Sequence, residues 1–180
     1  MRRFRQTYYD YFSLVYDRFV ALYSSDKQGI LRSYLACKLQ IARGGKILDL
    51  CTGTASLLPH LKNSTGNEGV VIGLDFFRGM LGVAKEKTAS LKNVFLVQAD
   101  AAQLPFKTAV FDGVTCSHAF YELKGGSQDM CLREIRRVLK QGRPFLMMEH
   151  DIPKNPLVRI LFLPQALFYG CKKGATDIET

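Results

Sequence analysis

Hydrophobic and polar positions along the chain alternate between short apolar runs and stretches with helical spacing. The apolar runs typical of strands lie at residues 46–50, 70–75, 94–100, 110–117 and 144–149. Between them, helical spacing predicts helices at residues 56–62, around residues 80–84 and from residue 127 onward. Because strand and helix alternate, the pattern predicts an α/β fold with a doubly wound, mostly parallel sheet and helices on both faces.

Two further amphipathic helices are predicted ahead of the first strand, at residues 12–23 and 30–39, where they would form an N-terminal lid. Ser127 is placed to cap the last helix. The residues of that last helix expected to face the sheet are Met130, Cys131, Ile135, Val138 and Leu139.

The chain length of 180 residues predicts one domain with a sizeable core. Its parts would be N-terminal helices (1–43), a cofactor-binding core (44–150) and a tail (151–180). The five cysteines are odd in number and form no C-x-x-C pair, which predicts neither a disulfide framework nor a metal site. This cysteine usage is typical of a reducing compartment, so a cytoplasmic location is expected.

The formal charge of +9 and the pI near 9.4 suit a polyanion or an anionic membrane surface. No nucleic-acid recognition motif accompanies the charge, so no specific nucleic acid is expected as a partner. The basic start is not followed by the apolar region of a secretory signal. The apolar run at residues 157–169 is shorter than the roughly 20 residues of a spanning helix, which leaves peripheral membrane contact as a hypothesis.

Acidic side chains end three of the predicted strands, at Asp49, Asp75 and Asp100, and Ser117 ends the fourth. Ligands of such sheets bind beyond the carboxyl ends of the strands, so these residues are expected to converge on one crevice. A carboxylate after the second strand can accept both hydroxyls of a ribose, and one after the third can accept from an adenine amino group. The alternative is that each acid only caps a following helix or turn.

The turn after the first strand, in the stretch K-I-L-D-L-C-T-G-T-A at residues 46–55, contains Gly53, which permits close backbone approach to a ligand. Cys51 and Ala55 occupy places where dinucleotide-binding turns carry glycine. The turn therefore favours a nucleoside cofactor without a diphosphate.

These blocks resemble the class I S-adenosylmethionine-dependent methyltransferases, and within them the ubiquinone/menaquinone-biosynthesis group. Besides the turn, the blocks are I-G-L-D, A-D-A-A-Q-L-P-F, F-D-G-V-T-C-S, L-R-E-I-R-R-V-L-K-Q-G-R and M-E. The resemblance implies a Rossmann-like fold and the cofactor S-adenosylmethionine. By the resemblance, the cofactor-binding residues would be Asp49, Cys51, Gly53, Thr54, Asp75, Asp100, Ala101 and Ser117.

The resemblance implies methyl transfer to a small, lipophilic acceptor, such as a quinone precursor or a phospholipid head group. Quinone-type relatives have an Arg-Asn pair after the fourth strand, where this chain reads H-A-F-Y-E at residues 118–122. His118 and Tyr121 are the predicted catalytic residues, with Glu149 a weaker candidate. The alternative is that His118 is only packed in the protein or faces solvent. Relatives also add a helix and an antiparallel strand pair, which this chain is expected to lack. Residues 157–169, a partner or a homodimer would then cover the edge of the last strand.

Two other functions compete with methyl transfer. Tyr169 and Lys173 have the Y-x-x-x-K spacing of some NAD(P)-dependent oxidoreductases. The third interpretation is a truncated domain that binds a cofactor without turnover.

Overall fold

The structure is a computed structural model, and it describes residues 13, 16, 29–123 and 126–149. The chain divides after Glu149 into two units, and every described residue lies in the first. The tail and most of the first predicted helix therefore lie outside the described residues. The organisation as a single domain stays a prediction.

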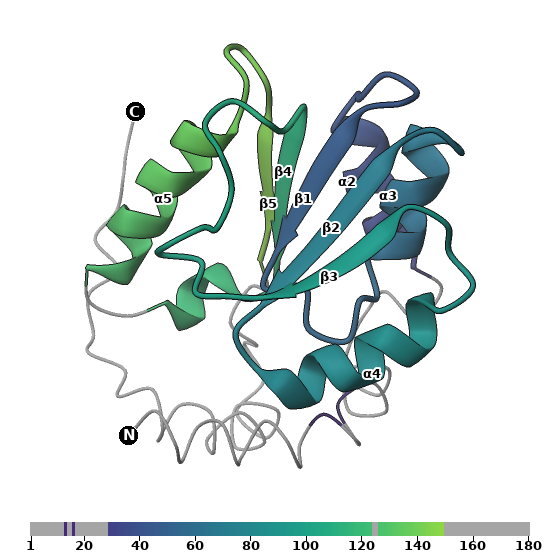
Figure 1. Cartoon of the computed structure of the whole chain (residues 1–180), viewed down its shortest axis with the longest axis horizontal. Helices are drawn as coiled ribbons and strands as arrows, with labels where there is room; N and C mark the ends of the chain where they lie inside the picture. The colour runs from purple at the N-terminus through teal and green to yellow at the C-terminus, as the bar shows by residue number, and fades with distance from the viewer. Residues whose placement is uncertain (1–12, 14–15, 17–28, 124–125, 150–180) are drawn as a thin grey trace, which may run out of the picture. The chain divides into compact units, whose positions relative to one another are not determined.

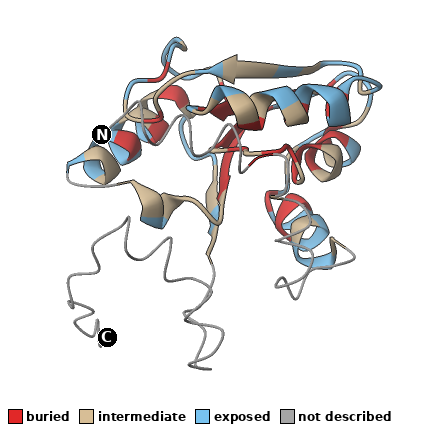
Figure 2. Ribbon diagram, turned by 90° about the horizontal axis from the view of Figure 1, so that it is seen from below, coloured by how far each residue is buried: buried red, intermediate tan, exposed pale blue. Residues whose placement is uncertain are grey.

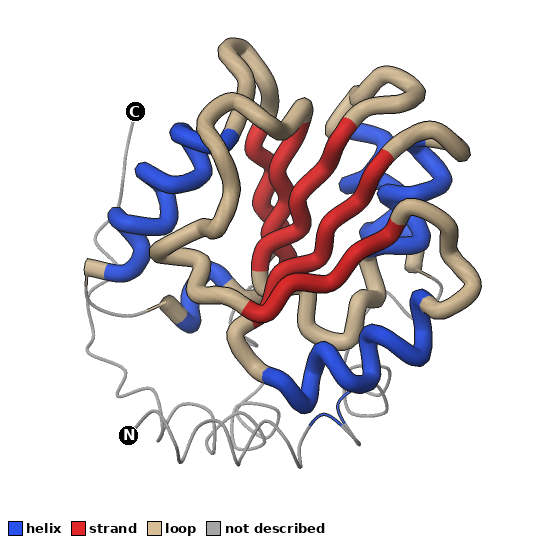
Figure 3. Tube along the Cα trace, viewed as in Figure 1, coloured by secondary structure: helices blue, strands red, loops and turns tan. Residues whose placement is uncertain are grey.

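Five parallel strands form one sheet in the order β3-β2-β1-β4-β5, as Figures 1 and 3 show. They are β1 (Lys46–Leu50), β2 (Val70–Asp75), β3 (Val94–Gln98), β4 (Gly113–Ser117) and β5 (Phe145–Met148). The strand order reverses between β1 and β4, the kind of position at which open parallel sheets bind ligands. The predicted doubly wound, mostly parallel sheet is confirmed.

Helices cover both faces of this sheet. They are α2 (Ile30–Lys38), α3 (Leu58–Thr65), α4 (Arg78–Thr88) and α5 (Ser127–Val138), with a short 3₁₀ helix, η1 (Phe120–Glu122). Neighbouring residues of β1 belong to two different hydrophobic clusters. Ile47 packs in the cluster with α2 and α3, and Leu48 packs in the cluster with α5. Buried residues accordingly gather on the strands and on the helix sides that meet them (Figure 2). None of the helices in the described part has the length and apolar character that crossing a membrane requires.

The strands β3 and β4 are shorter than predicted. β4 begins at Gly113 rather than at residue 110, because the preceding Phe111 pairs with Leu139 in an isolated bridge. The carboxylate of Asp112, the residue between Phe111 and Gly113, accepts from the Lys46 backbone nitrogen at 2.9 Å and from Lys140 Nζ at 2.8 Å. β3 ends two residues before Asp100, whose Oδ1 accepts from the Ala102 nitrogen at 2.9 Å and so forms a turn.

Two expectations for the helices on either side of the sheet are corrected. Gly126 is the N-cap of α5, and Ser127 is already helical, so its hydroxyl does not cap. Met130 is 48% exposed, because it lies one residue before the buried series that starts at Cys131. On the other face, α3 covers residues 58–65 instead of 56–62, because the turn after β1 is longer than predicted.

Candidate active site

The turn after β1 is tied to the end of β2. The Gly53 nitrogen donates to Asp75 Oδ2 at 2.8 Å, and the Thr52 nitrogen donates to the Leu74 carbonyl at 2.9 Å. Gly53 has a φ of 55°, in the left-handed region that glycine adopts readily. A Cβ there would meet no atom within 4 Å, so the backbone conformation, and not packing within the protein, calls for glycine. The predicted convergence of the ends of β1 and β2 is present.

Asp49 lies fully buried beneath this turn. The hydroxyls of Thr52 and Thr115 each donate to one of its carboxyl oxygens at 2.7 Å. Burial raises the pKa of Asp49 to about 7, the two hydroxyls oppose that shift, and the charge of Asp75 adds to it. Sequence reasoning missed both threonines. Thr115 lies opposite Asp49 in the pairing of β1 with β4, and this register was not predicted from the sequence.

Asp75 is the second buried carboxyl of the site. Its Oδ1 accepts from the Phe77 nitrogen at 2.8 Å, while Oδ2 holds Gly53. Burial raises the pKa of Asp75 to about 6, these backbone hydrogen bonds lower it, and the charge of Glu122 raises it. The Phe76 backbone also lowers this pKa by hydrogen bonding, and a carboxylate with about four lone-pair sites keeps acceptor capacity for a ligand beyond these bonds.

Cys51 and Thr54, both predicted to touch the cofactor, make hydrogen bonds within the protein. A hydrogen bond with Cys116, reinforced by burial, raises the pKa of the Cys51 thiol, so this cysteine stays protonated and is a poor nucleophile. Cys51 and Ala55 have φ of 52° and 64°, so two non-glycine residues adopt left-handed conformations in this turn. The Thr54 hydroxyl accepts from Lys87 Nζ at 3.4 Å.

The region after β3 contains Asp100 and the buried Ala101. The loop that follows is held by α5: Glu134 Oε2 accepts from the Leu104 nitrogen at 2.7 Å. Arg137 donates to the carbonyls of Phe106 at 2.7 Å and Leu104 at 3.0 Å, and it pairs with Glu134. Two side chains of one helix therefore fix this loop beside the end of β3.

Replacing Arg137 by methionine should release this loop. We expect the free energy of unfolding to fall by about 1–2 kcal/mol, since two backbone carbonyls lose their donor and part of the ion pair is screened by solvent. Urea denaturation checks this value. Arg136→Met is the matched control, because Arg136 is exposed and should leave stability unchanged. Equal effects of both substitutions would contradict the role given to Arg137.

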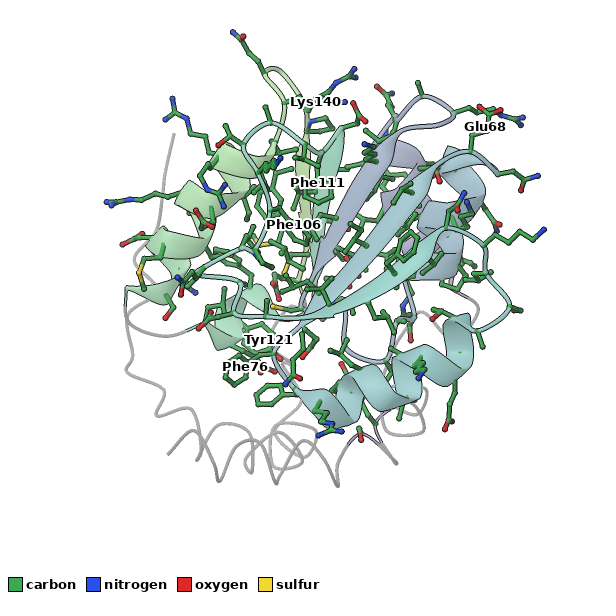
Figure 4. The ribbon with its side chains drawn as sticks, viewed as in Figure 1. Glu68, Phe76, Phe106, Phe111, Tyr121 and Lys140 are labelled. Carbon is green, nitrogen blue, oxygen red and sulfur yellow. The ribbon has the colours of Figure 1, made fainter. Side chains whose placement is uncertain are left out.

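The ends of β4 and β5 carry the remaining predicted residues. Ser117 ends β4, and the next residue, His118, has a φ of 55° and donates from its backbone nitrogen to the Met148 carbonyl at 2.7 Å. Tyr121 follows in η1 and is 49% exposed. In Figure 4, Tyr121 and Phe76 both lie at the end of the sheet where the strands have their carboxyl termini, and Lys140 and Glu68 lie at the opposite end.

Acidic groups gather at this carboxyl edge although the chain as a whole carries a charge of +9. The charge of Asp75 raises the pKa of Asp49, and the charge of Glu122 raises the pKa of Asp75. Buried carboxyls with raised pKa values favour a cationic ligand, because a positive charge stabilises their ionised form. A separate groove of about 860 Å³, lined by α5, residues 108–109 and 139–143, and Phe145, contains none of the predicted site residues.

The chain is similar to proteins of a known family. Residues 4–168 match the ubiE/COQ5 methyltransferase family. The demethylmenaquinone methyltransferase of Staphylococcus epidermidis is 35% identical over 156 residues, which cover 87% of this chain and 64% of that protein. The chain thus spans less than two thirds of the length of this curated relative.

Solved structures share the fold. A SAM-dependent methyltransferase from Aquifex aeolicus aligns with a TM-score of 0.65 and 23% identity, over 79% of this chain and 82% of that one. A Haemonchus contortus phosphoethanolamine N-methyltransferase, solved with phosphomonomethylethanolamine and S-adenosylhomocysteine, aligns with a TM-score of 0.62 and 21% identity, over 75% and 32% of the two chains. These likenesses confirm the Rossmann-like fold.

Proposed function

Because the chain belongs to the ubiE/COQ5 methyltransferase family, we propose that it binds S-adenosylmethionine at the carboxyl edge of its sheet and transfers the methyl group to a small, lipophilic acceptor. The observation that carries this proposal is the pair of buried carboxyls, Asp49 and Asp75, under a turn fixed by Gly53. Their raised pKa values suit a cofactor that bears a sulfonium and an ammonium group.

Each part of the cofactor has a candidate partner in this proposal. The free lone pairs of Asp75 would accept the ribose hydroxyls, and Asp100 with the Ala101 backbone would hold adenine. The turn with Cys51, Gly53 and Thr54 would surround the methionine portion above Asp49, and Ser117 would flank the sulfonium. When bound, S-adenosylmethionine supplies an electrophilic methyl group. The protein then contributes alignment of the acceptor and exclusion of water.

The acceptor we propose is a hydroquinone or a related phenol. The name of the staphylococcal relative, a demethylmenaquinone methyltransferase, supports this class. His118 and Tyr121 stay predictions as catalytic residues, as do peripheral membrane contact and a homodimer over the β5 edge. The oxidoreductase alternative has no support from the comparisons, and its Tyr169 and Lys173 lie outside the described residues.

Isothermal titration calorimetry tests the proposed function. We expect the protein to bind S-adenosylmethionine and its product S-adenosylhomocysteine, and not to bind NADH. Incubation of the cofactor with a panel of hydroquinones should then yield methylated products, which mass spectrometry detects. Binding of NADH without binding of either S-adenosyl compound would contradict the proposal, and cofactor binding without turnover would favour a non-catalytic domain.

A further inference from the structure

Glu149 directly follows β5, at the sheet edge where β1, β2 and β4 also end. Its Oε1 accepts a hydrogen bond from the Phe120 nitrogen at 2.9 Å. One residue earlier, the Met148 carbonyl accepts from the His118 nitrogen at 2.7 Å. The end of β5 thus fixes the segment that carries His118 and Tyr121.

The second carboxyl oxygen of Glu149 has a different environment. Oε2 is buried, and no donor among the described residues lies within hydrogen-bonding distance of it. A buried polar atom left without a donor is unfavourable, so such an atom calls for an explanation. Burial raises the pKa of Glu149, hydrogen bonding from the Phe120 backbone opposes the shift, and the charge of Glu122 adds to it. A carboxylate with a raised pKa is a better base than an exposed glutamate.

We propose that Glu149 is the catalytic base of this site and that its Oε2 takes the proton from an acidic O–H of the methyl acceptor, a phenol or hydroquinone. This inference rests on the proposed methyl transfer. As the proton moves to Oε2, the electron pair of the O–H bond stays with the acceptor and provides the new bond to the methyl carbon, directly from oxygen or through the conjugated ring. The carbon–sulfur bond breaks and its pair stays on sulfur. For a ring-carbon acceptor, the proton on that carbon is afterwards released to water and the ring regains its aromatic state.

Oε1 and Oε2 thus have separate tasks. Oε1 positions η1, while Oε2 receives the proton. The titratable groups on the described segment that packs against Glu149 are His118, Tyr121 and Glu122. Because burial, and to a lesser extent the charge of Glu122, favours the protonated form of Glu149, kcat should rise with pH through a pKa above the ordinary glutamate range and then level off.

The variant Glu149→Gln tests the assignment, because its amide oxygen can still accept from Phe120 while its basicity is lost. The assay measures methyl transfer to 1,4-naphthohydroquinone, kept reduced, across a range of pH. We expect kcat to fall about 100-fold and the rising limb of the pH profile to disappear, with KM and the affinity for S-adenosylhomocysteine unchanged. Glu149→Asp, which keeps a carboxylate, should restore the pH limb with part of the rate.

Controls separate this role from a structural one. Glu68→Gln, at an exposed position at the opposite end of the sheet (Figure 4), should change nothing. An unchanged pH profile in Glu149→Gln would overturn the proposal. It would also be overturned if the affinity of Glu149→Gln for S-adenosylhomocysteine fell as much as its kcat, or if the rising limb disappeared in His118→Asn and not in Glu149→Gln. A wild-type protein that binds S-adenosylhomocysteine but methylates neither hydroquinones nor phenols overturns this inference alone. A wild-type protein that binds no S-adenosyl compound overturns the proposed function, and the inference falls with it.

Discussion

Replacing Asp75 by alanine is expected to weaken the binding of S-adenosylhomocysteine about a thousandfold. Two charge-assisted hydrogen bonds to the ribose hydroxyls are together worth about 4 kcal/mol, and that free energy corresponds to three decades in Kd. The same substitution frees the Gly53 and Phe77 nitrogens, so the turn after β1 also loses its anchor. Calorimetric titration of the purified variant measures the loss.

Two further variants sharpen the test of Asp75. Asp75→Asn keeps one acceptor oxygen and should bind with intermediate affinity. Asp129→Asn serves as the matched control, because Asp129 is exposed in the first turn of α5. If Asp75→Ala bound the product as tightly as wild type, the ribose assignment would be wrong.

The affinity for the cofactor is also expected to depend steeply on pH. Asp49 and Asp75 have pKa values of about 7 and about 6, and both must be ionised to stabilise a cationic ligand. Protons that leave on binding make the affinity fall on acidification, by about a thousandfold between about pH 8 and about pH 5. Calorimetry in buffers of different ionisation enthalpy should detect release of up to about two protons at pH 5 and almost none at pH 8.

The expected loss of affinity at low pH does not come from acid unfolding driven by protonation of Asp49 and Asp75. Their folded pKa values lie above the ordinary 3.8, so the folded chain takes up protons more readily than the unfolded chain. The resulting stabilisation is fully present below about pH 4 and is lost as pH rises through about 6 to 7. The empty protein therefore gains stability from Asp49 and Asp75 as the solution is acidified. An affinity that stays flat from pH 8 to pH 5 would contradict the expectation.

The sheet was predictable because its central strands β1, β2 and β4 are largely buried apolar runs that end in recognisable turns. β1 and β2 have the predicted bounds, since each is a continuous apolar run that ends at an acid or a small-residue turn. The start of β4 was not predictable, because Phe111 pairs with Leu139, which is distant in sequence. Pairwise contacts of this kind leave no periodic signal along the chain.

In the candidate site, as in the sheet, the positions at strand ends were predictable and the contacts between distant residues were not. That the acids of β1 and β2 meet follows from strand direction alone, and the structure brings Asp49 and Asp75 together. The hydroxyls of Thr52 and Thr115 on Asp49 depend on turn conformation and strand register, which composition does not reveal. The hydrogen bond between the Phe120 nitrogen and Glu149 likewise joins residues 29 positions apart, so the sequence pattern did not reveal it.

The buried carboxyls also bear on how long the protein survives in a cell. At neutral pH, ionised Asp49 and Asp75 lower the stability of the chain without its ligand. A ligand present at about 100 times its Kd adds about 2.7 kcal/mol, which reduces the population of unfolded chains about a hundredfold. Proteases that act on unfolded chains would then remove molecules without ligand first, so the abundance of this protein would follow the supply of the proposed methyl donor.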